Sequence, residues 1–377
     1  MGKRRGGFIW GMIDLVMTVL TLAVATGIIF AYAAPSVNPN KVWIFAYAGL
    51  AAPILYLVNL FFMLYWAIRW KPLFFLPALL LLVGIPKIKA FYHFSTDKND
   101  ASTGIAEGIK IMTYNVEGFI QRDPDTRKYT SSAWDITNFI RETDPDIVCI
   151  QEFQSAPGAS EEKINDWLAD WPYRKIAYTI NREGRGVWGS AIYSKYPILD
   201  GETIDFEGSR NGALWVELLV SPADTLRVIC NHLETTYVKD DDLAFLQPEN
   251  FANDPDKSGQ IRKIAGRLRK GFRNRAHQAD TLASLIAGRD IPTVVCGDFN
   301  DPPISYAYHT IRNGYSDTFE DKGSGYGYTY KRLYRLMRID YILRSPHLET
   351  LSYRSPDTPW SDHKPVIASV RLIKPAE

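Results

Sequence analysis

Long apolar stretches make up most of the first ninety residues. Two of them, at 8–34 and 42–68, contain a single acid and no base, and Arg69 lies at the edge of the second. Each is long enough to cross a bilayer core, which takes roughly 20 apolar residues. A third stretch, Leu73–Pro86, is shorter and is interrupted by Pro77. The pattern is typical of a membrane anchor.

We therefore predict a transmembrane anchor over residues 1–92 with about three helices, at 8–34, 42–68 and 72–92. The third helix reaches this length only if Lys87 and Lys89 extend to the headgroups, and an interfacial or re-entrant segment is the alternative. A cleaved signal peptide also begins with a basic cluster. Its apolar region is shorter, however, and no second apolar stretch follows it directly.

Positive charge predicts the orientation of this anchor. Basic residues lie at the N-terminus and in the Arg69/Lys71 turn, whereas the loop between the first two stretches holds only Lys41. Because basic loops stay in the cytoplasm, the N-terminus and the turn are predicted to be cytoplasmic. Three spans place the remaining chain outside the cytoplasm, in the periplasm if this is an inner-membrane protein of a Gram-negative bacterium. Two spans would place the remaining chain in the cytoplasm.

After a polar, unpatterned linker at 93–108, short apolar runs indicate a folded domain over 109–374. Runs rich in Val and Ile predict buried strands, at about 109–115, 146–151, 173–179, 188–194, 212–220, 225–232, 292–297, 338–343 and 364–372. Helices are predicted near 130–143, 160–168, 258–288 and 303–312. Short strands mixed with a few helices fit an α/β (α+β) domain of two packed sheets.

Polar side chains stand at the C-terminal ends of several of these runs. Asn115, Glu152, His232 and Asp298 are examples. We expect such groups to gather at one edge of a sheet. Carboxylates there can hold a hard cation, while imidazoles and an amide meet phosphoryl oxygens. The pattern predicts metal-assisted attack on phosphorus.

Seven short motifs follow one another over roughly residues 109–373: Thr113-Tyr-Asn115, Gln151-Glu152, Ser194-Lys-Tyr-Pro-Ile198, Asn231-His-Leu233, Gly297-Asp-Phe-Asn300, Arg338-Ile-Asp-Tyr-Ile342 and Ser361-Asp-His363. In these motifs the chain resembles the endonuclease/exonuclease/phosphatase family, which includes DNase I, the abasic-site endonucleases, the neutral sphingomyelinases and the inositol polyphosphate 5-phosphatases. The resemblance implies a four-layer α/β/β/α sandwich of the DNase I-like type. It does not cover residues 1–108, and an insert at about 236–274 interrupts it.

The resemblance further implies a metal site. It makes Glu152 the main ligand of one Mg²⁺ or Mn²⁺, and Asn115 either a ligand or a neighbour of the ion. Asp362 is expected to be an outer ligand or a ligand of a second metal. These roles compete with simpler ones, because a lone acid at a strand end is usually just solvated.

Five more residues receive catalytic roles from the resemblance. Asp298 orients or deprotonates the attacking water, and Asn300 donates to a phosphoryl oxygen. Asp340 accepts an N–H bond from His363, whose imidazolium offsets charge on the phosphorus. His232 matches the histidine of the DNase I and sphingomyelinase branches. Water is then expected to attack a phosphate ester in line, without a covalent intermediate.

Composition adds only general limits. The net charge of +1 gives no global attraction to nucleic acid, so any electrostatic recognition has to be local. The three cysteines, Cys149, Cys230 and Cys296, fall in predicted core strands and are interpreted as buried thiols. No obligate protein partner is evident.

The insert ends in a basic run. Eight Lys or Arg and no acid occur from Lys257 to Ala279, and apolar residues recur at every third or fourth position. This spacing predicts an amphipathic helix with a basic face. Up to residue 273 we predict contact with the phosphates of a lipid surface or polyanionic substrate, through Arg267, Arg269 and Lys270. From Arg275 onward, a solvated charged face on an ordinary helix of the family is expected.

Three functions remain open at this point. A membrane-tethered hydrolase of phosphodiesters or phosphomonoesters, such as lipid headgroups, is favoured by the anchor and the basic insert. A surface nuclease acting on DNA or RNA is the alternative, which the low net charge does not encourage. A binding module without catalysis is the third, and the complete set of polar residues argues against it.

Overall fold

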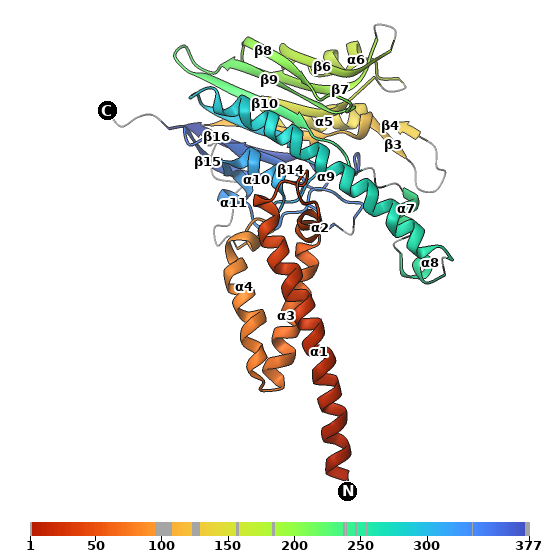
Figure 1. Ribbon diagram of the computed structural model, residues 1–377. Coiled ribbons are helices and arrows are strands. Elements are labelled where there is room, and N and C mark those ends of the chain that lie inside the picture. Colours follow the sequence, from red (N-terminus) through yellow and green to blue (C-terminus); the bar gives the residue numbers. More distant parts are fainter. Residues whose placement is uncertain are drawn as a thin grey trace.

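The computed structural model describes residues 2–94, 108–122, 129–155, 158–182, 185–236, 238, 240–245, 247–253, 255–333 and 335–373. Within these residues, an α/β domain is joined to a helical bundle, and the N-terminus lies at the far end of that bundle (Figure 1). The predicted linker at 93–108 lies almost entirely outside the described residues.

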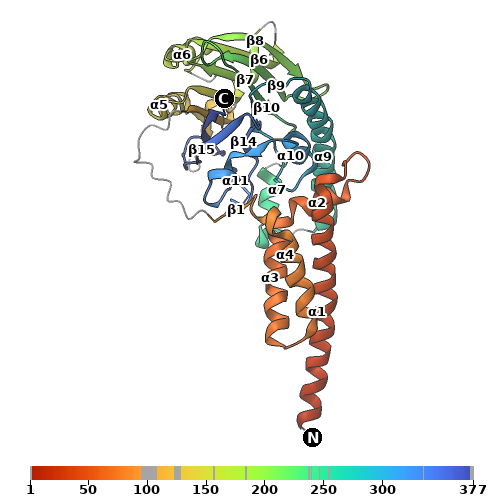
Figure 2. The same cartoon turned by 90° about the vertical axis from the view of Figure 1, so that its left-hand side faces the viewer.

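The bundle consists of α1 (Gly2–Ala33), α3 (Ala52–Ile68) and α4 (Phe75–Ile88). Helices α3 and α4 form an antiparallel pair beside α1 (Figures 1 and 2). At their turn, Arg69 Nη2 lies 3.0 Å from Asp14 Oδ2, and the Tyr65 hydroxyl donates to Asp14 Oδ1 at 2.8 Å. This cluster places Asp14 level with the turn. From Asp14 to the end of α1, the helix extends about 30 Å at 1.5 Å per residue, which matches a bilayer core.

The helices differ from the predicted spans in two places. Phe8–Ser36 is long and apolar enough to cross a membrane by itself, as expected, but 42–68 forms two helices, α2 (Ile44–Leu50) and α3, bent by 70°. The predicted helix over 72–92 is also too long, since α4 ends at Ile88. Pro77 does not interrupt it, because proline is tolerated in the first turn of a helix.

Two six-stranded sheets form the α/β domain. The strands of the first sheet, in spatial order, are β12 (Ser316–Asp317), β14 (Asp340–Arg344), β11 (Thr293–Asp298), β10 (Thr225–His232), β9 (Gly212–Leu219) and β8 (Ile198–Asp205). The strands of the second are β15 (Leu348–Arg354), β16 (Val366–Leu372), β2 (Ile109–Asn115), β5 (Ile147–Phe153), β7 (Arg185–Ser194) and β6 (Tyr173–Arg182). Most strands coincide with a predicted apolar run. Of the strands in these two sheets, β8, β12 and β15 were not predicted.

Apolar side chains divide the domain into layers. One core cluster, including Ile111 and Val228, lies between the two sheets. A second joins the β2 sheet to α5 (Ala133–Thr143) and α6 (Glu161–Trp167), and a third joins the β11 sheet to α9 (Lys257–Ala287) and α10 (Tyr306–Arg312). This helix–sheet–sheet–helix order confirms the expected four-layer sandwich.

Smaller elements complete the chain. They are α7 (Asp240–Phe245), α8 (Pro248–Asn253), α11 (Thr318–Lys322), the paired strands β1 (Tyr92–His93) and β13 (Gly325–Tyr326), and the pair β3 (Ile120–Arg122) and β4 (Tyr129–Ser131). Short 3-10 turns occur at Ala34–Ser36, Pro72–Phe74 and Glu117–Phe119.

The bundle and the α/β domain pack closely. Helix α2 approaches the loop after β11 so tightly that a Cβ on Gly49 would lie 2.2 Å from the Ile304 carbonyl oxygen. The buried Arg338 guanidinium donates from Nε to the Ala90 carbonyl at 2.9 Å. Strand β1 pairs with β13 directly beyond α4. The predicted anchor is therefore docked on the domain through several elements.

Candidate active site

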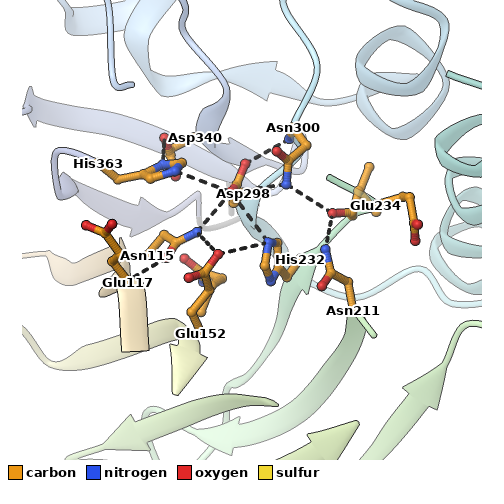
Figure 3. A network of polar contacts seen from close by, with 12 residues as sticks. Asn115, Glu117, Glu152, Asn211, His232, Glu234, Asp298, Asn300, Asp340 and His363 are labelled. Atoms are coloured by element: carbon orange, nitrogen blue, oxygen red, sulfur yellow. Dashed lines mark hydrogen bonds and ion pairs between the residues drawn. The ribbon is translucent and has the colours of Figure 1, made fainter. Parts of the chain in front are cut away.

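Polar side chains from both sheets converge at one edge of the sandwich (Figure 3). On the first sheet, His232 at the end of β10 is level with Asp298 at the end of β11, and Asp298 is level with Asp340 on β14. On the second sheet, β2 and β5 run parallel and bring Asn115 and Glu152 to the same edge. Residues far apart in sequence thus meet because their strands end together.

Asp298 lies at the centre of this edge and is 1% exposed. Its Oδ2 accepts hydrogen bonds from Asn115 Nδ2 at 3.0 Å and from Asn300 Nδ2 at 3.2 Å. Its Oδ1 accepts one from the Asn300 backbone N–H at 2.8 Å. Asn115 Nδ2 also donates to Glu152 Oε1 at 3.2 Å. The two predicted ligands and the predicted base therefore belong to one network.

The backbone at this edge is unusual. Gly297 has φ of 132°, and a Cβ there would lie 1.9 Å from the Asn231 carbonyl oxygen, so only glycine fits before Asp298. Glu152 and Asn300 have φ of 57° and 52°, a left-handed region that non-glycine residues seldom adopt. Such conformations concentrate at functional sites, where the surrounding structure holds them in place.

His363 forms the other side of the site. Its Nδ1 lies 3.0 Å from Asp340 Oδ2, and its Nε2 lies 3.8 Å from Asp298 Oδ2. The Tyr330 ring packs on the imidazole with centroids 5.0 Å apart. Burial lowers the pKa of His363, but the Asp340 and Asp298 carboxylates outweigh it and raise the pKa well above its usual value. The two carboxylates therefore favour the cationic form of this imidazole.

His232 differs from His363 in charge. Its Nε2 lies 3.6 Å from Asp298 Oδ2 and 3.8 Å from Glu152 Oε1. Burial, together with the neighbouring His363, lowers the pKa of His232 to about 3. A neutral imidazole can still donate one N–H, so the site contains one cationic and one neutral donor.

The carboxylates indicate that a cation fits here. Burial raises the pKa of Glu152 to about 8 and that of Asp298 to about 7. Oxygens of both acids converge on one amide nitrogen of Asn115, so the surroundings attract positive charge. Carboxylate and amide oxygens are the ligands that Mg²⁺ and Mn²⁺ prefer. Among the described residues, Asp298, Asp340 and His363 also offer three ligand atoms within 4.8 Å of one another.

Asp362, the third predicted metal ligand, has a different partner. Its Oδ2 lies 2.7 Å from Arg332 Nε, and its backbone N–H donates to Glu117 Oε2 at 3.1 Å. Arg332 is also paired with Glu117. The sequence analysis did not identify Glu117, whose pKa burial and Asp362 raise to about 7. Its position two residues after Asn115 is the signal that could have revealed it.

A second buried network joins α9 to the segments that follow β10 and β11. Glu234, 1% exposed, follows β10 and accepts a hydrogen bond from Ser209. Arg275 of α9 is fully buried and donates to the Glu234 carbonyl at 2.7 Å and to Asp301 Oδ1 at 3.0 Å. The expectation of a solvated face from Arg275 onward is therefore wrong at this residue, because the loops after His232 and Asn300 enclose it.

Arg275→Met is expected to lower the free energy of unfolding by about 3–5 kcal/mol, because it leaves the Asp301 carboxylate buried without its partner. The exposed Arg262 of the same helix is the matched control, and Arg262→Met should change stability by less than about 0.5 kcal/mol. Urea denaturation of the full chain in detergent, followed by near-UV circular dichroism, measures both. Equal stability of the two variants would contradict a stabilising role for the buried Arg275–Asp301 pair.

The three predicted basic contact residues lie on the N-terminal half of α9. Arg267 pairs with Asp242 of α7, and the Arg269 guanidinium lies 5.6 Å from the centre of the Trp43 ring. Lys270 is exposed. None of the three lies among the residues that surround Asp298.

Comparison with known proteins identifies the domain. The family model described as "Endonuclease/Exonuclease/phosphatase family" matches residues 112–363. The chain belongs to this family. Endonuclease/exonuclease/phosphatase enzymes hydrolyse phosphoester bonds and generally use divalent metal ions. A second model, for a domain of unknown function, matches residues 14–91, which include most of the bundle.

Individual relatives of this endonuclease/exonuclease/phosphatase protein are distant. The CCR4-Not complex 3'-5'-exoribonuclease subunit Ccr4 of Phaeosphaeria nodorum is 28% identical over 271 residues, which are 58% of this chain and 45% of that protein. The chain therefore spans less than half of this curated relative. An endonuclease/exonuclease/phosphatase structure from Beutenbergia cavernae is 19% identical with a TM-score of 0.50, covering 70% of this chain and 71% of that one, and shows the shared fold. The human Nocturnin catalytic domain with bound sulfate is 16% identical, with a TM-score of 0.48. The match covers 71% of this chain and 95% of the Nocturnin chain.

Proposed function

We propose that this chain is a membrane-tethered, divalent-metal-dependent phosphoesterase that hydrolyses a phosphodiester or phosphomonoester by in-line attack of water. The observation that carries this proposal is the position of the Asp298 carboxylate. It lies between the Asn115–Glu152 pair, at the ends of β2 and β5, and the His363–Asp340 pair, which joins the segment before β16 to β14. A proton acceptor, an anion-binding cation and hard metal ligands are thus within one small site.

Glu152, with Asn115 beside it and Asp362 more distant, would hold Mg²⁺ or Mn²⁺, which when bound polarises a phosphoryl oxygen. We favour these residues over the Asp298, Asp340 and His363 group. In that group, His363 Nδ1 and the Asp340 carboxylate are already hydrogen-bonded to each other at 3.0 Å. A metal between them would have to break that bond.

The chain's own residues supply the remaining chemistry. Asp298 accepts the proton of the attacking water, since this buried carboxylate faces the Nε2 atoms of both histidines, at 3.6 Å from His232 and 3.8 Å from His363. His363, held by Asp340, donates from Nε2 to an oxygen on which negative charge develops. Asn300 and the neutral His232 add donors that need no change in charge. These donors are held by the fold before substrate arrives, which favours electrostatic stabilisation of the transition state.

A panel of phosphate esters tests this proposal with the full chain in detergent, with and without Mg²⁺. Lipid, nucleic acid, inositol phosphate and chromogenic diester substrates should include at least one that is hydrolysed only with the metal present. A lipid headgroup at the bilayer is the substrate that the anchor favours. Hydrolysis of none of them, or of any at an equal rate without metal, would contradict the proposal.

Polynucleotides are the second candidate. The similarity to an exoribonuclease subunit supports them, and the net charge of +1 provides no general attraction to a polyanion. In the same panel, turnover of RNA or DNA with lipid esters inert would favour this alternative. A non-catalytic binding module is the least supported, because the base, the cationic donor and the metal ligands are all present.

We further propose that residues 1–92 anchor the chain in a bacterial inner membrane, with the catalytic domain outside the cytoplasm. The N-terminal end of α1 and the Arg69–Lys71 turn lie at one end of the bundle, and the domain lies at the other (Figure 2). A reporter active only outside the cytoplasm should therefore be active when fused after Glu377 and inactive when fused at Lys71. The reverse pattern would place the catalytic domain in the cytoplasm.

A further inference from the structure

Helix α9 connects the active site to the anchor. Near its middle, the Tyr47 hydroxyl of α2 donates to the Ala265 carbonyl at 2.5 Å, and the Tyr47 and Phe272 rings meet edge to face at 5.2 Å. Asn40 and Arg273 form two further hydrogen bonds, both of 3.2 Å. Further along the helix, Arg275 holds the loop after His232. The α2 side of α9 therefore faces the end of the bundle that is nearest to the domain.

The apolar stripe of α9 continues beyond this contact and is left uncovered. Ile261 lies one helical turn before Ala265, on the same side of the helix, and is 47% exposed. Phe251 of the adjoining α8 is 39% exposed, and Lys257 Nζ lies 5.8 Å from the centre of its ring. On the anchor, Trp43 and Ile44 are 41% and 45% exposed. We call Trp43, Ile44, Phe251 and Ile261 the interfacial patch.

Basic side chains of α9 lie beside the interfacial patch, while Glu249 and Asp256 lie on its α8 side. Arg262, Lys263 and Arg269 of α9 are exposed, and Arg269 lies over the Trp43 ring. Tryptophan with neighbouring Lys and Arg is typical of protein at the headgroup level of a membrane. An apolar helix face bordered by bases binds anionic bilayer surfaces. Figure 1 places α8, and Figure 2 the neighbouring α7, on the side of the domain from which the bundle extends.

We propose that the interfacial patch lies in the headgroup layer of the bilayer that contains the anchor, so that α8 and the start of α9 rest on the membrane. This inference depends on the membrane tether of the proposed function. It selects a lipid surface because Trp43 and Ile44 of the patch belong to the anchor itself, because α2 is docked on α9, and because exposed bases of α9 lie beside the patch. Ile261 and Arg275 are separated by about 21 Å along α9, which keeps the active-site edge close to the headgroups. The substrate class that fits is a phosphate ester carried by a lipid.

Site-directed fluorescence tests the position of the patch without any assay of activity. The three native cysteines are fully buried, so a thiol-reactive, environment-sensitive dye should label one introduced surface cysteine. The full chain carrying Ile261→Cys or Phe251→Cys is reconstituted in phosphatidylcholine/phosphatidylglycerol vesicles with a nitroxide on the headgroup. Leu199→Cys, 56% exposed on β8 at the far side of the domain, is the control outside the membrane. Leu57→Cys, 65% exposed within α3, is the control inside it and is read with an acyl-chain nitroxide.

The dyes at Ile261→Cys and Phe251→Cys should emit at shorter wavelength than the dye at Leu199→Cys and be quenched at least about twofold more. If they are quenched no more than Leu199→Cys while Leu57→Cys is quenched, the patch does not touch lipid and this inference is wrong, although the tether stands. If Leu57→Cys is not quenched either, the anchor does not enter the bilayer, and both proposals are wrong.

Discussion

Asp298→Asn is expected to lower kcat by about 10³-fold or more on any substrate of this enzyme, because an amide cannot accept the proton of the attacking water. The substitution preserves the shape of the side chain, and the neighbouring Asn115 and Asn300 can still contact its remaining carbonyl oxygen. His363→Ala should cause a loss of similar size, since it removes the only imidazolium in the described site. Steady-state kinetics on the best substrate of the panel, with circular dichroism to verify folding, measures both.

The combined variant provides a sharper test. Residues that act on the same transition state give losses that are far from additive. Asp298→Asn with His363→Ala should therefore cost much less than the product of the two separate factors. A second histidine–aspartate pair, His347 with Asp290 at 3.2 Å on the surface, is the matched control. His347→Ala and Asp290→Asn should retain the wild-type kcat. Full activity in folded Asp298→Asn or His363→Ala would rule out the proposed site.

Removal of divalent cations should have an equally large effect. EDTA is expected to reduce activity by about 10³-fold or more, and Mg²⁺ or Mn²⁺ in excess should restore it, because several kcal/mol of transition-state stabilisation depend on the ion. A second readout is thermal stability. Millimolar Mg²⁺ should raise the melting temperature of the wild-type chain, since a ligand that binds only the folded state stabilises it.

Glu152→Gln distinguishes the proposed metal site from other sites. It should remove both the Mg²⁺-dependent rise in melting temperature and most of the activity, whereas Glu202→Gln, on the exposed face of β8, should change neither. A normal response to Mg²⁺ in Glu152→Gln, together with loss of the response in Asp340→Asn, would place the ion in the Asp298, Asp340 and His363 group instead.

Local sequence was sufficient for much of the fold. Runs such as Ile147–Phe153 and Thr293–Asp298 predicted strands because buried strands need consecutive apolar residues. Strand β8 escaped prediction because it lies at the edge of its sheet, where only every third residue or so is even partly buried. Helices α7 and α8 are only six residues each, too short to produce a recognisable hydrophobic period.

Some site residues could also be predicted from local sequence, and others could not. Asn115, Glu152, His232 and Asp298 could be predicted because each stands at a strand end, where the sheet itself brings the groups together. Glu234 and Arg275 could not be predicted. Their pattern in sequence is that of solvated residues, and only the loops folded over them make them buried. Burial lowers the pKa of both histidines, which lie 3.6 and 3.8 Å from the same Asp298 carboxylate, and the contact of His363 with Asp340 is what raises the pKa of His363 instead.

The sequence by itself determined the apolar N-terminal region, the positions of most strands along the chain, and the polar residues at the ends of those strands. These features depend on neighbours along the chain. The tertiary structure alone decided how α2 docks on α9 and the Ile304 loop, which bases of α9 are internal, and which apolar side chains remain uncovered. Those properties depend on contacts between residues more than two hundred positions apart, as between Tyr47 and Ala265, and no local pattern in the sequence encodes them.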